Sequence, residues 1–545
     1  MNPRAMTITA YTAKAIHTMN PSQPVGQCVA IRDGRILGVG PIDEIRRFGE
    51  VVVDDRYADK VLVPGFVEGH SHALEGSVWS HLYLGYFDRR DPEGKLWEGL
   101  KTPDAVQQRL AAHVDQGPVD SPLIAWGVDP VYFDAAPINR WLLDAVSDTR
   151  PIVVIHASLH VMFVNSAAIA RAGLADMDLE GIVRDDQGRP SGILEEFAAM
   201  HPVFDALDCD IFEGVSDTRA LNRYAQAARR EGVTTITDLL NPMSDAAIAA
   251  LRDVTAAEDF PVRLVPALNA LAWDPQMGSE RVQQAIDYNH ERLQFGLVKL
   301  VTDGAIQNFT ARLQWPGYLT GQNNGVWNAP PQTFHEMVQH YHQAGLHLHV
   351  HTNGDEAVGV ILDALDEALA MWPRPDHRHT LQHVQLIRQD QLRRVARLGA
   401  CLNIFANHIY YWGDIHLSKT LGFDRCQRLE PVASADRMGI VFGIHCDAPV
   451  TPISPLFTAW CATTRETASG VTLGEAEKIS RARALEAITL GAAYTLRMDD
   501  RIGSLEPGKL ADITVLDEDP LDSTTPLKDI GVFDTLLSGR STGDG

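Results

Sequence analysis

The sequence lacks the features that mark disulfide-stabilised, secreted or membrane proteins. It has six cysteines in 545 residues and no Cys-x-x-Cys pair, so the thiols are expected to stay reduced. No apolar run approaches the roughly 20 residues that a membrane span needs. Residues 1–20 show no basic start followed by an apolar stretch, so no signal peptide is indicated. We therefore expect a cytoplasmic protein without a membrane partner.

Positive charge is also scarce. The 47 lysines and arginines are outnumbered by 71 aspartates and glutamates, and the net charge of -24 argues against nucleic acid or an anionic membrane as a partner. With 45% hydrophobic and 22% charged residues, the composition is that of a soluble globular protein. The length favours one large catalytic domain with appendages. We expect a small-molecule substrate and a homodimer or higher homo-oligomer.

Two histidines end the first strong apolar segment. Residues 61–63 lead into residues 64–72 (PGFVEGHSH), which is typical of a buried strand with His70 and His72 at its carboxyl end. Residues two apart along a strand point the same way, so both imidazoles can converge on one metal ion. The motif alone fits a pair of surface histidines on a loop equally well.

Apolar β-like runs and helical stretches alternate through most of the chain. We predict eight strands, at residues 61–66, 233–240, 261–268, 296–301, 346–351, 379–385, 400–405 and 440–444. Helices are predicted between them, at residues 245–257, 279–293, 333–344, 356–370 and 389–398. Regular alternation with eight strands predicts an α/β fold, a (β/α)8 TIM-like barrel.

The two chain ends and the gap after the first strand are predicted to be organised separately. A hairpin signal at residues 28–39 and a strand at residues 511–516 indicate β structure at both ends. We predict that residues 1–63 and 497–545 form a composite β-sandwich satellite domain, and residues 64–496 the barrel. The roughly 160 residues between the first two strands are too long for a loop, so we predict an insertion, at about residues 80–225, over the barrel mouth. It contains a strand-like stretch at residues 151–157 and a helix-like one at residues 165–173.

Ligand-type side chains stand at the ends of five predicted strands. In a (β/α)8 barrel these ends share one face, where catalytic groups gather. The residues are His70, His72, Lys299, His351, His383 and Asp447. A lysine within an apolar strand is almost never buried without a partner. Addition of CO₂ would turn its amine into a carboxylate able to bridge two metal ions.

Each of these residues also has a purely structural interpretation. The two later histidines could be hydrogen-bonded core residues, Asp447 could cap a turn, and Lys299 could form an ion pair. We predict that core role for three other histidines, His347, His349 and His445. Five strand ends that carry ligand-type residues together are a far more specific signal of a metal centre than any one of them.

With these residues the chain resembles the amidohydrolase superfamily, and within it the branch of N-substituted formamide deformylases. The resemblance runs from about residue 30 to residue 516 and includes residues 160–166 (HVMFVNS) and 503–512 (GSLEPGKLAD). It implies a metal-bearing (β/α)8 barrel with a β-sandwich built from both termini. Carried over residue by residue, it gives the metal shell as His70, His72, Lys299, His351, His383 and Asp447.

Two departures from the family pattern leave this metal shell unchanged. After the lysine of strand four, the branch has Asp-Gly-Ser-Leu-Gly-Ser-Arg-Thr, whereas residues 303–310 read DGAIQNFT. Where the branch has an arginine after Gly-Asp, Glu356 stands here. The substrate contacts are therefore expected to differ.

The resemblance implies a metal-dependent hydrolase that cleaves an amide-like C–N bond other than a peptide bond, as in an amide or formamide. Metal-bound hydroxide would attack the carbonyl, because a divalent ion lowers the pKa of bound water to about 7. Asp447 would act as general base and then acid, and His160 would stabilise the oxyanion or orient the carbonyl. The ligand types suit two Zn²⁺ ions per chain, bridged by carboxylated Lys299, and also fit iron, manganese or nickel.

Two other functions fit the same pattern. A metal-dependent decarboxylase or isomerase could use the same barrel, metal and aspartate. A non-catalytic binding protein could retain only the fold, although a degenerate relative would be expected to have lost at least one ligand. Hydrolysis is therefore the favoured interpretation.

Aromatic residues that follow several predicted strands are expected near the barrel mouth. The candidate substrate-binding residues are Trp79, Tyr83, Trp315, Tyr318, His408, Tyr410 and Trp412. They could equally pack the insertion onto the barrel. As a pocket lining they would favour neutral or aromatic substrates. The alternative is that Arg312, downstream of the fourth strand, anchors an anionic substrate.

Overall fold

The computed structural model describes residues 7–118, 120–133 and 138–543. The chain divides into two compact units. The first comprises Met1–His72 and Ala225–Gly545, and the second is Ala73–Tyr224. All of the predicted barrel strands belong to the first unit.

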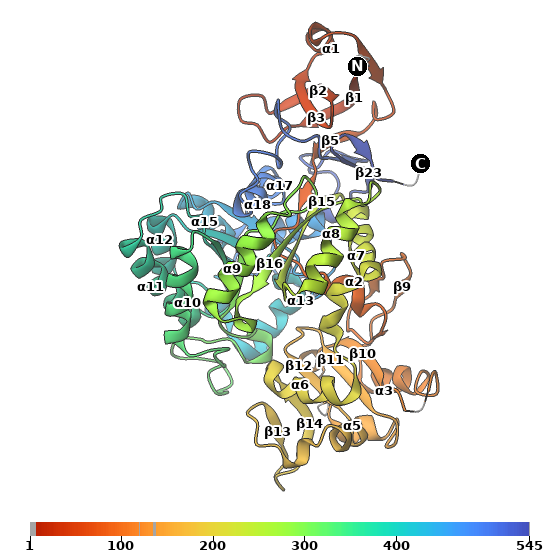
Figure 1. Ribbon diagram of the computed structural model, residues 1–545, viewed down its shortest axis with the longest axis vertical. Helices are drawn as coiled ribbons and strands as arrows, with labels where there is room; N and C mark the ends of the chain where they lie inside the picture. The colour runs from red at the N-terminus through yellow and green to blue at the C-terminus, as the bar shows by residue number, and fades with distance from the viewer. Residues whose placement is uncertain (1–6, 119, 134–137, 544–545) are drawn as a thin grey trace. The chain divides into compact units, whose positions relative to one another are not determined.

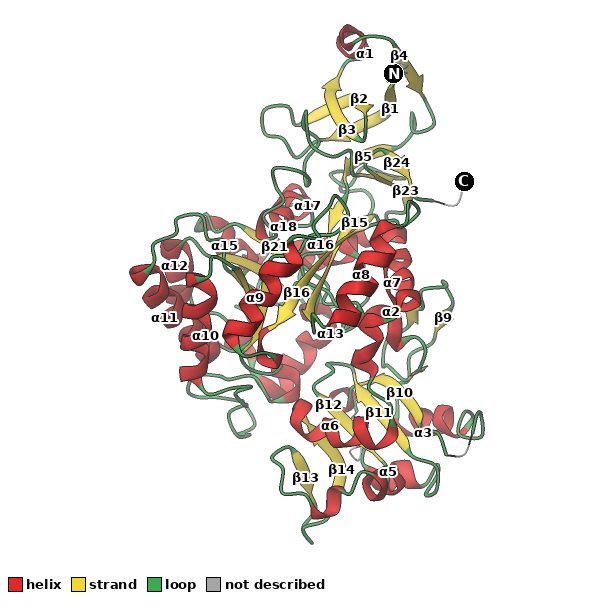
Figure 2. Cartoon of the chain, viewed as in Figure 1, coloured by secondary structure: helices red, strands yellow, loops and turns green. Residues whose placement is uncertain are grey.

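Eight parallel strands form a curled sheet in the first unit, with helices on its outer face (Figure 2). Backbone hydrogen bonds link the chain just beyond the first and last strands. Asp447 donates to the carbonyl of His70 (3.2 Å), and His72 donates to that of Ala448 (2.8 Å). The predicted order of eight parallel strands is confirmed. In sheet order they are β6 (Phe66–Val67), β15 (Val233–Asn241), β16 (Arg263–Asn269), β17 (Leu297–Val301), β18 (His347–Thr352), β19 (Thr380–His383), β20 (Cys401–Ile404) and β21 (Phe442–Ile444).

The predicted helices of this unit are all present. Helix α12 has the predicted bounds, whereas α9 begins earlier than predicted. The Asp274 side chain accepts hydrogen bonds from the N–H groups of Gln276 and Met277, and this cap sets the earlier start. The helices that follow β15 in the chain are α8 (Asp245–Ala256), α9 (Pro275–Ile286), α10 (Pro331–Gln343), α11 (Asp355–Met371), α12 (Gln389–Leu398), α13 (His408–Ile415), α14 (Phe423–Cys426), α15 (Val432–Arg437), α16 (Pro455–Thr464), α17 (Arg481–Ala487) and α18 (Leu490–Thr495).

The prediction of a single first strand at residues 61–66 is wrong. The structure divides it into β5 (Val61–Pro64), which pairs with strands from the chain ends, and β6, which pairs with β15 of the curled sheet. Gly65 lies between them, and a Cβ at this position would come within 2.3 Å of the Thr234 side chain. Glycine therefore permits the close approach at the point where the chain passes from one sheet to the other.

Segments from both chain ends form a second eight-stranded sheet. In Figure 1 the red N-terminal strands and the blue C-terminal strands lie together, and β5 pairs with β1 and β22. A buried ion pair of 2.7 Å between Arg263 on β16 and Asp512 joins the C-terminal segment to the curled sheet. Residues 1–6 and 544–545 of the predicted composite domain lie outside the described residues. The strands are β1 (Ile8–His17), β2 (Val25–Arg32), β3 (Arg35–Gly40), β4 (Val51–Asp54), β5, β22 (Ile513–Leu516), β23 (Val532–Leu537) and β24 (Arg540–Ser541).

The second unit has its own six-stranded sheet with a hydrophobic cluster on each face. Side chains along β11 alternate between the clusters, with Val153 in one and Val154 in the other. The predicted strand and helix of this region are confirmed as β11 and α5. Its main elements are β7 (Leu82–Tyr83), β10 (Leu123–Val128), β11 (Ile152–His156), β12 (Val161–Val164), β13 (Ile182–Arg184), β14 (Pro190–Glu195), α2 (Leu74–Val78), α3 (Pro103–Ala111), α4 (Arg140–Asp144), α5 (Ser166–Arg171) and α6 (Glu196–Leu207).

The described parts of the chain contain neither a membrane-spanning helix nor a disulfide. None of their helices is both long enough and apolar enough to cross a membrane. All six cysteines are described, and each is buried and outside any disulfide.

Candidate metal centre

The carboxyl ends of the curled sheet carry the predicted ligands. Parallel strands end at one face, so residues far apart in the sequence meet there. All of the predicted ligand side chains are buried except that of His72, which is partly exposed. The predicted ligands are His70 and His72 after β6, Lys299 in β17, His351 in β18, His383 in β19 and Asp447 after β21.

Asp447 contacts two of these histidines directly. Its Oδ1 lies 3.4 Å from Nε2 of His70 and 3.3 Å from Nε2 of His72. Its backbone φ of 57° is uncommon for a residue other than glycine and is of a kind that gathers at functional sites. Burial raises the pKa of the Asp447 carboxyl, but the neighbouring imidazole of His72 holds that pKa below its usual value. Asp447 is therefore ionised, as a ligand or general base requires.

His70 directs one ring nitrogen toward the cluster. Its Nδ1 lies 2.7 Å from Oε1 of Gln382, and an amide oxygen only accepts hydrogen bonds. This bond assigns the proton to Nδ1 and the lone pair to Nε2, the arrangement found in metal-binding histidines. The same Nε2 lies 3.3 Å from Nζ of Lys299, and burial lowers the pKa of that lysine to about 7.

His383 has no hydrogen-bond partner at either ring nitrogen, although it is only 2% exposed. Its ring centroid lies 4.4 Å from that of His70 and 4.5 Å from that of His351. Its Nδ1 is 3.7 Å from Oδ2 of Asp447. Burial lowers the pKa of His383 well below its usual value, so the ring is neutral. A buried imidazole in this state is costly unless it finds a partner, and a metal ion would supply one.

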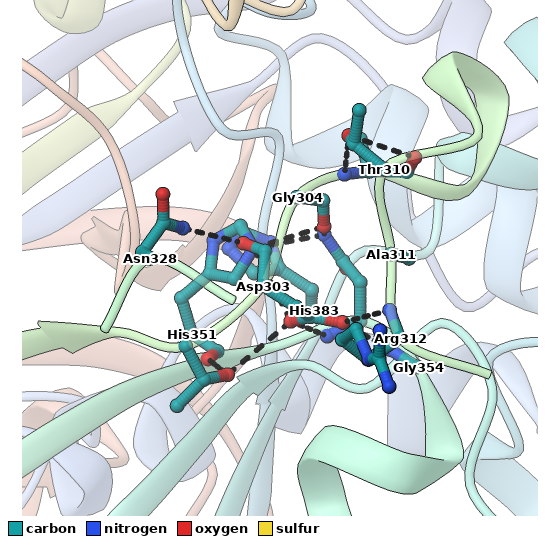
Figure 3. Close-up of polar contacts among 12 residues, drawn as sticks. Asp303, Gly304, Thr310, Ala311, Arg312, Asn328, His351, Gly354 and His383 are labelled. Atoms are coloured by element: carbon teal, nitrogen blue, oxygen red, sulfur yellow. Dashed lines mark hydrogen bonds and ion pairs between the residues drawn. The ribbon is translucent and has the colours of Figure 1, made fainter. Parts of the chain in front are cut away.

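The backbone beside His351 is fixed by Asp303, which is fully buried after β17 (Figure 3). The carbonyl of Gly304 lies 3.3 Å from Nε2 of His351. The Asp303 carboxylate accepts hydrogen bonds of 2.9–3.0 Å from three backbone N–H groups, those of Arg312, Asn353 and Gly354. Asp303 thus joins the segment after β17 to the end of β18, which carries His351.

We expect Asp303→Asn to lower the free energy of unfolding by about 2–3 kcal/mol, since each buried donor left without an acceptor costs roughly 1–3 kcal/mol. The new amide group would face the backbone N–H of Asn353 or those of Arg312 and Gly354. Urea unfolding measures the change. The control is Asp253→Asn on the exposed side of α8, which should stay within about 0.5 kcal/mol of wild type. A loss for Asp303→Asn no larger than that of the control would contradict this role.

The guanidinium of Arg312, the alternative anion anchor, is already hydrogen-bonded within the protein. Its guanidinium makes two hydrogen bonds of 3.1 Å to Glu356 and one of 3.1 Å to each of the carbonyls of Asn324 and Gly325. Its face also lies 5.1 Å from the Trp327 ring. These bonds use the donors that would bind a substrate carboxylate, so the anion-anchor alternative is disfavoured.

His160, predicted to stabilise the oxyanion, belongs to the second unit, where Glu196 holds it. Its Nδ1 lies 3.0 Å from Oε2 of Glu196, and the backbone N–H of Glu196 donates to the carbonyl of His160 at 2.8 Å. Glu196 (φ 63°) and the neighbouring Leu159 (φ 66°) both have left-handed backbone, which is uncommon outside glycine. No local pattern in the sequence points to Glu196, and the catalytic role of His160 stays a prediction.

The predicted substrate-binding aromatics take up different environments. In the second unit, Trp79 and Tyr83 form a cluster with Trp126, with ring centroids 5.0–5.5 Å apart. In the first unit, Trp315 is 94% exposed, whereas Tyr318 is 4% exposed and its hydroxyl donates to a backbone carbonyl. Trp315 and Tyr318 therefore do not line a common surface.

Of the predicted residues after β20, His408 and Trp412 are buried and Tyr410 is partly buried. His408 is fully buried, with Nε2 3.0 Å from Oε1 of Gln307, and Trp412 stacks on it at a centroid distance of 4.7 Å. Tyr410 packs against Phe457 with centroids 5.1 Å apart. Contacts of these three residues with substrate stay a prediction.

The prediction that His445 is a hydrogen-bonded core histidine is wrong. The residue is fully buried, but neither of its ring nitrogens has a hydrogen-bond partner. His347 and His349, in contrast, are hydrogen-bonded to backbone carbonyls, as predicted. The sequence feature that pointed to a different role for His445 was its spacing, because His445 precedes Asp447 by two residues, as His70 precedes His72.

Within the part of the chain that the structure describes, two overlapping groups of side chains could hold a divalent ion. One is His70, His72 and Asp447, and the other is His70, His383 and His445. Within each group the ligand atoms lie within 4.8 Å of one another. Neutral imidazoles and a carboxylate suit zinc and related metals. The donor set and the unsatisfied nitrogens of His383 therefore fit a divalent metal ion.

The chain belongs to the amidohydrolase family, because the model of that family matches residues 58–542. The resemblance inferred from the sequence motifs is confirmed.

Two relatives extend along almost the whole chain. It is 26% identical over 544 residues to the N-substituted formamide deformylase of Arthrobacter pascens, covering 96% of each protein. It is 26% identical over 549 residues to the protein LONG AFTER FAR-RED 3 of Arabidopsis thaliana, covering 97% of this chain and 90% of that one. Among solved structures, a metal-dependent hydrolase from Pyrococcus horikoshii shares the fold with a TM-score of 0.73 at 20% identity, covering 96% of this chain and 99% of that one.

Proposed function

We propose that the protein is a metal-dependent hydrolase of an amide-like C–N bond in a small substrate. The observation that carries the proposal is the cluster of an ionised Asp447 with His70, His72 and the unpartnered His383 at the strand ends. Membership of the amidohydrolase family and a relative named N-substituted formamide deformylase support this class of reaction.

The residues at the strand ends divide into ligands and a proton carrier. A bound divalent ion would lower the pKa of a water to about 7 and polarise the substrate carbonyl. Asp447 would take the proton of the attacking water and then deliver it to the leaving nitrogen. Its carboxylate lies within 3.4 Å of Nε2 of both His70 and His72. Asp447 would therefore hold the proton next to the histidines that would bind the metal. The residues that would hold the metal are His70, His72, Lys299, His351, His383 and Asp447.

Lys299 would serve as a carboxylated, bridging ligand. Its amine is buried beside Nε2 of His70, and the pKa lowered by burial to about 7 leaves much of it neutral at neutral pH. A neutral amine nitrogen can form a bond to CO₂ with loss of one proton, which gives a carbamate with two ligand oxygens. Six ligand residues exceed the four that one tetrahedral zinc needs, which favours two zinc ions per chain.

Hydrolysis by the purified, metal-loaded protein tests this proposal. A panel of amides, formamides, ureas and esters should include at least one amide or formamide that the protein cleaves, and a chelator should abolish the activity. If the protein binds divalent metal yet cleaves no C–N bond in the panel, the hydrolase proposal fails.

The substrate is expected to be neutral or aromatic, because the Arg312 guanidinium already pairs with the Glu356 carboxylate and is not available to bind an anionic substrate. An N-benzyl or N-aryl amide should therefore have a kcat/KM at least about tenfold higher than an acetylated acidic amino acid, a difference of roughly 1.4 kcal/mol. Acetylglutamine against acetylglutamate is the matched pair that separates charge from size. A clear preference for the acidic substrate would reject this expectation.

A further inference from the structure

His445 occupies a central position among the candidate ligands, although the family's metal shell does not include it. Its ring lies between those of His70 and Phe405, with centroid distances of 4.6 Å and 5.0 Å and interplanar angles of 17° and 19°. The ring of His383 is 5.1 Å away. His445 is therefore in contact with two residues of the predicted metal shell.

Packing alone does not explain a histidine at this position. A neutral imidazole has one N–H donor and one acceptor nitrogen. Both nitrogens are buried without a hydrogen-bond partner, which is unfavourable for each group. A phenylalanine would stack between His70 and Phe405 without that cost. The ring nitrogens of His445 therefore need a bonding partner that no described residue of the protein supplies.

We propose that His445 is an additional metal ligand, in a group with His70 and His383. All three side chains are buried, and their ligand atoms lie within 4.8 Å of one another. Because Nδ1 of His70 is bonded to Gln382, its Nε2 is the nitrogen directed at the ion, and His445 joins the ligands around that nitrogen. A further imidazole favours zinc, nickel, copper or iron over magnesium and calcium. The inference rests on the proposed metal centre.

Metal affinity, measured without reference to activity, tests this assignment. Apo protein is titrated with Co²⁺ and Zn²⁺ against a chromogenic chelator, and the visible spectrum of bound Co²⁺ is recorded. His445→Phe keeps a flat ring between His70 and Phe405 but removes both nitrogens. It should weaken metal binding at least about tenfold and change the Co²⁺ spectrum. Phe405→Leu is the matched control, because it alters the stack and leaves the nitrogens, and it should bind metal within about threefold of wild type.

Each outcome decides between ligation and packing. Binding by His445→Phe within about threefold of wild type, or an equal loss in both variants, would overturn the assignment. A zinc-loaded wild-type crystal decides independently of how the variants fold, through a His445 nitrogen at about 2.0–2.1 Å from the anomalous zinc peak. A separation beyond about 3 Å would overturn the assignment. A wild-type protein that binds no divalent ion would overturn the proposed metal centre as well.

Discussion

Asp447→Asn should retain most of the bound metal and lose about 10²–10⁴-fold in kcat, the range for a general acid–base residue. Asparagine keeps the size of the side chain and one oxygen that can reach the ion. It cannot take a proton from water, whereas the carboxylate of Asp447 is ionised and lies 3.3–3.4 Å from Nε2 of both His70 and His72. Steady-state kinetics and elemental analysis of the same preparation separate the two effects.

Two comparisons sharpen this test. Asp424→Asn, on the exposed side of α14, should keep wild-type turnover. Asp447→Glu keeps the acid and should recover part of the activity lost by the asparagine variant. If Asp447→Asn remained within about tenfold of wild type, its role would be structural and another base would carry the proton.

Lys299→Ala should lower the metal content from about two equivalents per chain to one or fewer, because it would remove the proposed bridging ligand. Turnover should fall with it. Lys299 is 1% exposed within an apolar strand, and its amine lies 3.3 Å from Nε2 of His70. Elemental analysis of protein purified without chelator measures the content, and ¹³C-labelled bicarbonate followed by NMR detects a carbamate on the lysine.

Lys299→Met is the matched control for the space that alanine leaves, since it keeps a long side chain without the amine. Both variants should lose metal if the amine is required, whereas only alanine should do so if volume is what matters. A single equivalent in wild type, together with full metallation of Lys299→Ala, would contradict the bridging role.

Sequence patterns were sufficient to predict which residues of the candidate site lie together at the strand ends. His70 and His72 stand two residues apart at a strand end, and Lys299 interrupts an apolar strand, so local spacing and the geometry of parallel strands placed them on one face. The eight strands followed from apolar runs bounded by helices. The family motifs supplied the assignment of the same residues to a metal shell.

The remaining features depend on tertiary contacts that no local pattern encodes. The bonds between Arg312 and Glu356 join residues 44 positions apart, and the division of the first strand at Gly65 depends on how close Thr234 approaches. His445 was misjudged because its spacing from Asp447 does not show whether its ring nitrogens are hydrogen-bonded. Glu196 beside His160 could not be found for the same reason, since the two residues meet only in the folded second unit.

Because β5 continues into β6, the strands from the chain ends help to fix the position of the first two candidate ligands. β5 is held between β1 and β22, and the same run of backbone continues through Gly65 and β6 to His70. A truncation that removed β22 would leave β5 as an exposed edge strand. It would also weaken the support of the backbone segment that leads to His70. The position of His70 is therefore set in part by residues near the far end of the chain, and the C-terminal strands are a poor place for deletions or tightly fused tags.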